Sequence, residues 1–559
     1  MEGLFVFKMW MALVILFATP LFANEAGTSI EAHVVGYVEV PFNLKMGDHY
    51  DHRELTRPLQ ATPPAAVASR PPSPHIVPIP APTAQEVPLK MLESSWDVTS
   101  SSSQIPANAD LAVGPAHVVA VASTGVFVYN SQDGSAISGT SLASFFSALS
   151  PGGSVEEPSV LYDDFRDRYV VIAGEVDPAA PNSALLVAVS ATNDPGSSWQ
   201  QVRVPTLLAN FDPDGPGPLP ASPHYATVPR IGMEASQIYV SFLMASTQGG
   251  RGGTAVWNLW KDPLYGGGNV TIQAGIRPFS AGNDYDNEVA LRPVRFYGNI
   301  VDDVIDRGVF LAGYDGMSVD GVPTLQIFWL TTVGPSVTKF VVSLPGVDSL
   351  VGGVDLPDVP QRDSPVAVSS GRRSIYSAVW QDGELWLVTT VVPPTGADAG
   401  EVTAYWVELQ VPSPTFVALQ DQGQISGDAL VPEAHTFFPS LDISPDGLVA
   451  IGYSISAPNL ELSSVLSFVG PNCDSAQVVL APIFLRRGTA VWPTQTWGTY
   501  SGTAWDDGLC FWHHNSHPIG GAMPTWRSSV GKFCLDPGTI FEDGFEAGDV
   551  SQWCSSTGG

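Results

Sequence analysis

The sequence of 559 residues has little charge, and most of the charge that it has is negative. Asp, Glu, Lys and Arg make up 14% of the chain, with 55 acidic against 24 basic residues and a formal net charge of −31. A surface so poor in cations repels phosphate backbones and anionic lipids, which argues against nucleic-acid binding and membrane-surface adhesion. We expect an acidic, soluble protein without a nucleic-acid partner.

Long apolar segments and helical periodicity are also lacking. After residue 23 no segment approaches the ~20 apolar residues of a membrane-spanning helix, and none longer than ~10 residues keeps a helical period. The chain instead has 54 Gly and 49 Pro, and 10% of its residues are aromatic. Abundant turn formers with aromatic residues favour many short strands, so the predicted fold class is all-β. The best short helix is predicted at 141–149.

The N-terminus has the pattern of a secretory signal peptide. Lys8 precedes the apolar run Met9–Phe17, which ends at Thr19-Pro20, and Ala23 supplies a small residue for cleavage. We therefore expect residues 1–23 to be removed from a secreted, periplasmic or cell-surface protein that has no membrane span after cleavage. An uncleaved membrane anchor is the alternative interpretation of the same run.

Cysteine is scarce, and all four residues lie near the C-terminal end: Cys473, Cys510, Cys534 and Cys554. An even number in an exported chain predicts disulfides, and four cysteines allow three connectivities. Because Cys510 and Cys534 flank one hairpin-like region, we favour that bridge, with Cys473–Cys554 as the second. There is no CxxC spacing, so a zinc site is not expected.

Composition divides the chain into five segments. A weakly patterned stretch over 24–56 follows the signal peptide, and a Pro/Ser-rich tract over 57–104 is predicted to be a semi-extended linker. Residues 105–535 repeat one pattern of apolar strand, polar turn, second apolar strand and Gly/Pro-rich excursion. An acidic tail occupies 536–559.

The repeats amount to about seven units of roughly sixty residues each, which predicts a β-propeller of about seven four-stranded blades. Six or eight blades are also compatible with such degenerate repeats. Two β-sandwiches in tandem are the competing architecture, since they also give short strands separated by turns. A sandwich pair should have a linker near its middle, and no composition break occurs between Ala112 and Phe533.

One tight turn is more specific than the repeats around it. It fits the pattern [ST]-x-D-x-G-x-[ST]-W, in which Asp194 can bond the turn backbone and Gly196 can take a positive φ. This turn resembles the Asp box of sialidase-like β-propellers, a structural motif without chemistry. With Asp110–Pro115 and Trp497–Ser501, it makes 105–535 resemble large exported bacterial propellers, most of which have no assigned activity. The motif residues are Thr192, Asp194, Gly196, Ser198 and Trp199.

The resemblance also defines what a catalytic member would need. Sialidases use an arginine triad, a Tyr/Glu nucleophile pair and an acidic residue, and they carry an Arg-Ile-Pro motif. The nearest match here, Arg203-Val204-Pro205, follows the Asp-box-like turn instead of opening the domain. Candidates for the triad are Arg230, Arg277, Arg292, Arg295 and Arg487, and candidate acids are Asp163, Asp164, Glu175, Asp284, Asp286 and Glu288.

Other clusters have weaker chemical signals. Asp284, Asp286 and Glu288 alternate oxygen ligands as calcium loops do, so calcium is the one cofactor that we consider, and 210–215 resembles a second such loop. His513, His514 and His517 are expected to be exposed loop residues, with a transition-metal site as the alternative. Trp492, Trp497, Trp505, Trp512 and Trp526 are either sugar-stacking platforms or, as we prefer, buried packing residues.

No GxSxG, HExxH, GxGxxG or Walker motif is present. We therefore expect a monomeric, secreted, non-catalytic propeller that binds a carbohydrate or protein ligand at one face. A sialidase-like glycoside hydrolase is the alternative.

Overall fold

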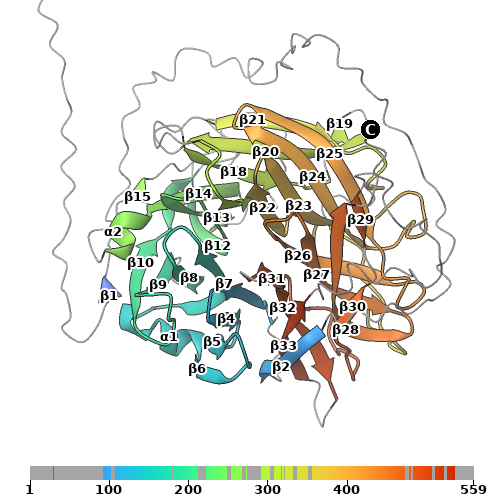
Figure 1. The fold of residues 1–559 in the computed structure, drawn as a ribbon, viewed down its shortest axis with the longest axis horizontal. Coiled ribbons are helices and arrows are strands. Elements are labelled where there is room, and N and C mark those ends of the chain that lie inside the picture. Colours follow the sequence, from blue (N-terminus) through green and yellow to red (C-terminus); the bar gives the residue numbers. More distant parts are fainter. Residues whose placement is uncertain are drawn as a thin grey trace, which may run out of the picture.

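The computed structural model describes a β-rich body and leaves most of the first ninety residues aside. The described residues are 92–101, 107–177, 182–211, 222–247, 253–266, 291–301, 307–316, 318–319, 321–331, 337–349, 355–471, 477–479, 482–506, 510–520 and 525–534, with two-residue strands at 29–30 and 272–273. Within these ranges strands predominate and helices are short, as the composition predicts (Figure 1).

Four antiparallel meanders form the N-terminal part of the body. Each runs outward from its first strand, and neighbouring strands pair in chain order. They are β3 (Asp110–Val113), β4 (His117–Ala122), β5 (Gly125–Asn130) and β6 (Ala136–Thr140); β7 (Ser154–Asp163), β8 (Arg168–Asp177), β9 (Asn182–Ser190) and β10 (Trp199–Pro205); β12 (Ser222–Met233), β13 (Gln237–Ser246), β14 (Gly253–Trp260) and β15 (Ile272–Gln273); and β16 (Arg292–Pro293), β18 (Gly308–Gly313), β20 (Val322–Thr331) and β21 (Val337–Ser343).

Three further meanders complete the body. They are β22 (Ser377–Gln381), β23 (Glu384–Val391), β24 (Thr403–Ser413) and β25 (Phe416–Ile425); β26 (His435–Ile443), β27 (Val449–Ala457), β28 (Leu460–Pro471) and β29 (Gln477–Val479); and β31 (Gly502–Trp505), β32 (Cys510–Ile519), β33 (Thr525–Cys534) and β2 (Leu92–Ser101). Short strands β1 (Ser29–Ile30), β11 (Leu208–Phe211), β19 (Ser318–Val319) and β30 (Ile483–Arg486) add to neighbouring edges.

The meanders are arranged as the blades of a propeller, which confirms the predicted fold. Five of them are separate sheets of four or five strands, whereas the sheets of β12–β15 and β22–β25 are joined into one sheet of ten. The joint is β17 (Arg295–Tyr297), which pairs in parallel with β12 on one side and with β22 on the other. The expected seven units are therefore present as meanders, but only five are separate blades.

The ring is closed by a strand from the N-terminal side. β2 pairs antiparallel with β33, more than four hundred residues away, and Figure 1 shows the two side by side. The indole of Trp96 on β2 packs between the rings of Tyr129 and Trp512, at centroid distances of 5.4 and 5.6 Å. Residues 92–101 lie inside the range that the composition assigned to a linker. The serine-rich composition of this segment led to the wrong prediction of a linker, and the partner strand is too distant in sequence to indicate the pairing.

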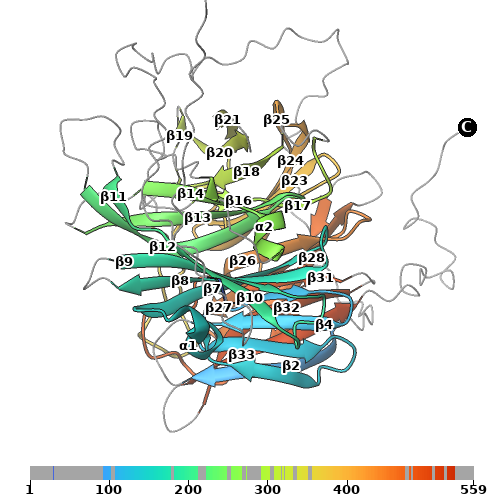
Figure 2. The ribbon, with the colours of Figure 1, turned by 90° about the vertical axis from the view of Figure 1, so that its left-hand side faces the viewer.

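The first strand of several meanders carries the same irregularity. Glu157, Val228 and Phe438 have positive φ at a register shift, and each is followed by proline. A bulge leaves one residue without a ladder hydrogen bond, so a proline, which has no N–H, fits there. These bulges bend the inner strands where they pass the axis. The propeller in side view shows β7, β12 and β26 crossing its middle (Figure 2).

Two glycines let inner strands approach closely. A Cβ added at Gly232 on β12 would lie 2.6 Å from the carbonyl oxygen of Val294, and one at Gly502 on β31 would lie 2.5 Å from the amide nitrogen of Leu111. Any side chain at these positions would push neighbouring blades apart. The tight spacing of the inner strands therefore depends on glycine.

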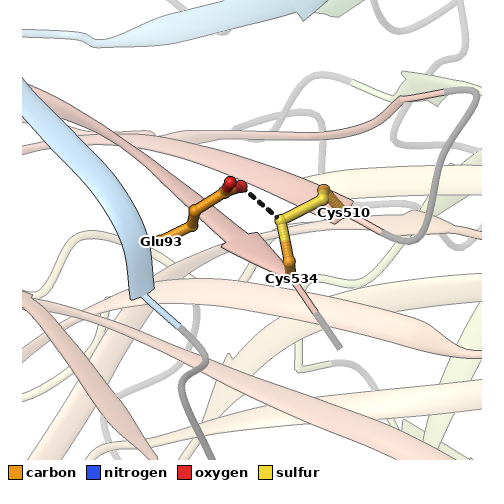
Figure 3. A group of neighbouring side chains, drawn as sticks. All are labelled: Glu93, Cys510 and Cys534. Atoms are coloured by element: carbon orange, nitrogen blue, oxygen red, sulfur yellow. Dashed lines mark hydrogen bonds between the residues drawn. A yellow bond between two sulfur atoms is a disulfide. The ribbon is translucent and has the colours of Figure 1, made fainter. Parts of the chain in front are cut away.

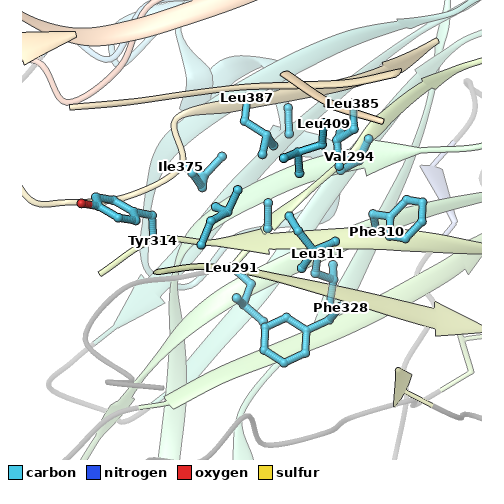
Figure 4. Close-up of a cluster of buried hydrophobic side chains, with 14 of the residues drawn as sticks. Leu291, Val294, Phe310, Leu311, Tyr314, Phe328, Ile375, Leu385, Leu387 and Leu409 are labelled. Atoms are coloured by element: carbon cyan, nitrogen blue, oxygen red, sulfur yellow. The ribbon is translucent and has the colours of Figure 1, made fainter. Parts of the chain in front are cut away.

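The apolar core lies between adjacent blades. Its largest cluster joins β18 and β20 to β23 and β24, and Figure 4 shows Leu311 of one blade in the same cluster as Leu385, Leu387 and Leu409 of the next. Tryptophans 492, 497, 512 and 526 are buried, and Trp505 is partly buried, which agrees with the preferred packing role. The short helix also forms as predicted, as α1 (Leu142–Phe145) followed by a 3-10 turn at Ser147–Leu149; α2 (Lys261–Tyr265) is the other helix of the described chain.

A disulfide joins Cys510 at the start of β32 to Cys534 at the end of β33, as predicted. Figure 3 shows the Glu93 carboxylate against the bridge, with Oε2 2.8 Å from Sγ of Cys534. Because bridged sulfurs offer no thiolate, this trio cannot hold a metal. The second predicted bridge, Cys473–Cys554, lies outside the described residues. No helix in the described ranges is long and apolar enough to cross a membrane.

Loss of the Cys510–Cys534 bridge should destabilise the protein by about 3 kcal/mol. The bridge closes a loop with a sequence separation of 24 residues, and loop-closure entropy of the unfolded chain sets the size of the effect. The measurement is the urea midpoint of the Cys510→Ala/Cys534→Ala variant against the wild type. Equal midpoints would contradict a stabilising role for the bridge.

Candidate ligand site on the propeller axis

A small cavity lies where the inner strands of all seven meanders meet. It is lined by residues of β3, β7, β12, β16, β22, β26 and β31, which places it on the axis of the ring. The positions open to the centre of a water molecule occupy about 40 Å³. A single water needs about 10–15 Å³ by that measure, so there is room for a few waters or a small polar group.

Two guanidinium groups lie near each other here, and one of them lines the cavity. Arg292 on β16 lines it, and Arg230 on β12 stands directly after the bulge of its strand, with its guanidinium 4.7 Å from the ring centre of Tyr500. Burial and the like charge of Arg230 lower the pKa of Arg292 to about 10, against the attraction of Asp110. Neither guanidinium makes a hydrogen bond or ion pair with the described residues, and Nε of Arg292 is shielded from solvent without a partner.

Two carboxyl groups accompany the arginines. Asp110 on β3 accepts hydrogen bonds from Ser159 Oγ at 2.6 Å and from the amide of Val160 at 3.0 Å, which ties the first two blades together. Glu157 accepts one from Asn108 Nδ2 at 2.8 Å, and its Oε2 is buried without a partner. Burial raises the pKa of both carboxyls, although hydrogen bonds and the nearby arginines oppose the shift.

Tyr500 lies beside Arg230 and next to Ser501, which lines the cavity. Its hydroxyl donates to the carbonyl of Pro158 at 3.0 Å, and burial together with the charges of Glu157 and Asp110 raises its pKa well above the ordinary value. An environment that opposes ionisation of the phenol also opposes its use as an oxyanion nucleophile. Tyr376, which also lines the cavity, donates to the carbonyl of Arg372 at 2.6 Å.

A further arginine that lines the cavity, Arg295, forms ion pairs with other residues. Arg295 comes three residues after Arg292, which is about 10 Å further along an extended chain. Its guanidinium lies 2.9 Å from Asp164 and 3.3 Å from Asp442, and its charge stands over the ring of Tyr297. Burial alone would lower the pKa of Arg295, but Tyr297, Asp442 and Asp164 outweigh it and raise the pKa. We interpret this end as structural.

The remaining arginine candidates do not reach the cavity. Arg203 of the Arg-Val-Pro sequence makes a bidentate ion pair with Glu175, at 2.7 and 3.0 Å. Arg487 is exposed and stands over the ring of Phe484. Arg277 lies outside the described residues. The described chain therefore brings two of the five candidates together at one end of the axis and assembles no triad there.

The candidate acids are likewise either paired with a cationic side chain or outside the described residues. Asp163 is fully buried against Lys261 Nζ at 2.8 Å and accepts from Tyr265 at 2.6 Å, and Asp164 and Glu175 are paired with arginines as above. Asp284, Asp286 and Glu288 lie outside the described residues, so the calcium loop there stays a prediction, as does most of 210–215. The carboxyls that do lie beside the arginines, Asp110 and Glu157, were not among the candidates.

The turn at 192–199 has the internal bonds that its sequence suggests. Asp194 Oδ1 accepts from the amide of Gly196 at 2.9 Å, and the indole of Trp199 donates to the carbonyl of Pro195 at 2.9 Å. The expected positive φ of Gly196 is wrong, since the glycine is not in that region. A Cβ at Gly196 would lie 3.1 Å from Asp194 Oδ1 and 3.2 Å from Ile137, so a larger residue there would require these two side chains to shift slightly.

The expectation of exposed loop histidines is also wrong. His513, His514 and His517 lie on β32 and are almost completely buried. Nδ1 of His513 pairs with the carbonyl of Gly502, and Nδ1 of His514 pairs with the carbonyl of Asp110, each at 2.9 Å. Adjacent residues of a strand face opposite sides, so His513 and His514 cannot share a metal.

A sequence signal for this end of the cavity exists but is short. The inner strands contain Glu157-Pro158-Ser159, Val228-Pro229-Arg230 and Phe438-Pro439-Ser440, each at the start of a repeat. The residue after each proline lies beside the axis: Ser440 lines the cavity, Ser159 bonds Asp110, and Arg230 stands over Tyr500. Aligning the repeats on this proline would have selected Arg230 and the strand of Glu157.

Comparison with known proteins gives a fold likeness only. No family model and no curated protein matches the sequence. Solved structures with a similar arrangement include a mitotic checkpoint complex (12% identity, 82% of this chain and 97% of that one, TM-score 0.35), the Trypanosoma rangeli sialidase in complex with sialic acid (12%, 77% and 60%, 0.30) and a thermostable family-43 glycoside hydrolase (13%, 62% and 98%, 0.29). At such scores none of them carries an argument about function.

Proposed function

We propose that the protein is a non-catalytic binding propeller that takes a carboxylate group of a carbohydrate or protein ligand between Arg230 and Arg292. The observation that carries the proposal is the guanidinium of Arg292, half-buried and without an anionic partner in hydrogen-bond reach among the described residues. Two like charges side by side at a cavity are stabilised by an anion, and a carboxylate fits guanidinium geometry.

The size of the cavity supports binding over hydrolysis. A space for a few waters admits a carboxylate but not a whole sugar ring, so the rest of the ligand would lie across the mouth. Among the described residues Arg295 is paired with Asp164 and Asp442 and adds no third free guanidinium here, and this pairing and the raised pKa of Tyr500 point the same way. We also propose that the protein acts outside the cytoplasm, with which the disulfide is compatible.

A sialidase-like glycoside hydrolase is the second candidate. It is favoured by one observation, the presence of Tyr500 and Glu157 beside Arg230 at the same end of the axis. In that case Tyr500 would attack the anomeric carbon as Glu157 takes the phenol proton, and the glycosidic C–O bond would break as the aglycone leaves with a proton from an acid such as Asp110, whose pKa burial raises. Side chains at the mouth would have to move to admit the substrate.

Substitution of Arg292 by Met should weaken binding of a carboxylate-bearing ligand by about 10- to 100-fold. That range corresponds to the loss of one or two charge-assisted hydrogen bonds. The measurement is biolayer interferometry against paired glycans and peptides with a free or an amidated carboxylate. Arg487→Met is the matched control, because that arginine is exposed and distant from the cavity. Equal loss in both variants, or no preference for the free carboxylate, would contradict the proposal.

A further inference from the structure

Three hydroxyl groups line the axial cavity on the side opposite Arg292. Ser440 lies on β26, Thr503 lies on β31, and Ser501 comes directly before β31; all three are buried. The seven meanders contact one another around the ring in chain order, so the sixth and seventh lie across the axis from the third and fourth, which carry Arg230 and Arg292. The cavity therefore has a guanidinium group on one wall and hydroxyl groups on the other.

The hydrogen bonds of these hydroxyl groups have a defined direction. Ser501 Oγ lies 3.1 Å from the carbonyl oxygen of Phe438, which can only accept, so Ser501 donates its proton there. The oxygen of Ser501 therefore accepts from Ser440 Oγ, 2.9 Å away. Ser440 has then used its one proton and accepts from Thr503 Oγ1 at 2.7 Å. All three protons are used inside this chain of hydroxyl groups.

His513 fixes the other end of the chain. Its Nδ1 lies 2.9 Å from the carbonyl oxygen of Gly502 and 3.2 Å from Thr503 Oγ1. Because the carbonyl oxygen can only accept, Nδ1 carries a proton, and Thr503 cannot donate to it. Burial lowers the pKa of His513 and keeps the ring neutral, so Nε2 carries no proton, and it has no partner among the described residues. Thr503 therefore donates to Ser440.

Other side chains on this side of the cavity have no free proton either. Asp110 on β3 accepts from Ser159 Oγ and from the amide of Val160, and Ser377 Oγ donates to the carbonyl of Leu441 at 3.3 Å. The wall that faces Arg292 thus offers oxygen lone pairs, whereas the guanidinium offers N–H groups. A ligand that satisfies both walls needs an acceptor at one end and a donor at the other.

We propose that the ligand group of the axial cavity is a 2-hydroxy carboxylate, a carboxylate whose neighbouring carbon carries a free hydroxyl group. This inference rests on the function proposed above. The carboxylate binds Arg292, and the ligand hydroxyl donates its proton to the oxygens of Ser440, Ser501 and Thr503. Because none of the twenty amino-acid side chains is a 2-hydroxy carboxylate, the inference favours a carbohydrate, in the form of a sugar acid, over a protein as the partner.

A hydroxyl group fits this wall better than other donors do. An ammonium group would bring a positive charge close to the guanidinium groups of Arg230 and Arg292. The N–H next to the carboxylate at a peptide C-terminus carries an acyl group, and a space for a few waters does not hold it. A hydroxyl group is neutral and small, and it has a single proton for a wall of acceptors.

Three small acids measure the preference for a hydroxyl group. Glycolate carries it, propanoate has a methyl group of similar size in its place, and glycine has an ammonium group there. Isothermal calorimetry at pH 7 and constant ionic strength gives the Kd of each acid for the purified protein. We expect glycolate to bind about 5- to 10-fold more tightly than propanoate, which corresponds to about one hydrogen bond, and more tightly than glycine.

Removal of the three hydroxyl groups tests which residues cause the preference. In Ser440→Ala/Ser501→Ala/Thr503→Val the Kd of propanoate and that of glycolate should become nearly equal. General damage to the site would weaken both acids together and leave the ratio of their Kd values unchanged. Thr436→Val is the matched control, because it removes a buried hydroxyl group of β26 that does not line the cavity, and it should keep the wild-type ratio.

The wild-type comparison decides the point even if the triple variant does not fold. Equal affinity of the wild type for glycolate and propanoate, or tighter binding of glycine, would overturn this inference and leave the carboxylate site in place. A preference for glycolate that persists in the folded triple variant would also overturn it, since the ligand hydroxyl would then bond elsewhere. Absence of binding by all three acids would refute the carboxylate site itself, and this inference with it.

Discussion

Deletion of residues 92–101 should abolish cooperative folding or lower stability by at least ~5 kcal/mol. β2 supplies the outer strand of the blade formed by β31, β32 and β33, and its Trp96 fills the space between Tyr129 and Trp512. Loss of a buried Trp alone costs about 3–5 kcal/mol, and the unpaired edge of β33 adds to this. The measurement is thermal unfolding followed by circular dichroism.

A chain that starts at residue 91 is the matched control for this deletion. It lacks everything upstream of β2 but keeps β2 itself, so it should unfold near the temperature of the full chain. If removal of 92–101 shifts the transition no more than this control does, β2 does not close the ring.

Acidification from pH 7 to pH 5 should destabilise the protein through three buried histidines. Burial lowers the pKa of His513 to about 3 and those of His514 and His517 to about 4, whereas an unfolded histidine titrates near 6.5. The native state therefore binds fewer protons than the unfolded state. The stability they provide is complete above pH 6.5 and is lost as pH falls toward 4, at about 2 kcal/mol per histidine by pH 5.

His514→Asn isolates this effect. The amide can still donate to the carbonyl of Asp110 but does not titrate, so the loss of stability between pH 7 and pH 5 should be about 2 kcal/mol smaller than in the wild type. A difference measurement is needed because carboxyls with raised pKa values, such as Glu157, change stability in the opposite direction. Urea unfolding at both pH values provides the comparison, and identical pH dependence would show that His514 is charged in the native state.

The fold followed from patterns that are local in the sequence. Alternating hairpins separated by Gly and Pro predict blades, and the flanking of one hairpin by Cys510 and Cys534 predicts their bridge. The closing strand could not be found in this way, because the pairing of β2 with β33 joins distant segments and its serines have low strand propensity. The fusion of two blades through β17 likewise depends on a parallel pairing that leaves no mark on the pattern.

The site was predictable only in its residue types. Arg230 and Arg292 were among the arginines considered, but no feature of the neighbouring sequence distinguishes them from Arg203. In the structure Arg203 forms an ion pair with Glu175 on another strand. Asp110 and Glu157 gain importance only because the ring brings β3 and β7 to the axis beside them. Likewise, the histidines of β32 were predicted to be loop residues because they are polar, whereas their strand is buried on both faces.

The most direct test of the binding function uses one fluorogenic sialoside in two assays. Turnover is measured for the wild type and for Tyr500→Phe, and binding affinity is measured for the wild type and for Arg292→Met. We predict binding that depends on Arg292 with no release of fluorophore above the buffer rate. Release that Tyr500→Phe abolishes would contradict the account and establish the arginine end of the axis as a hydrolase active site.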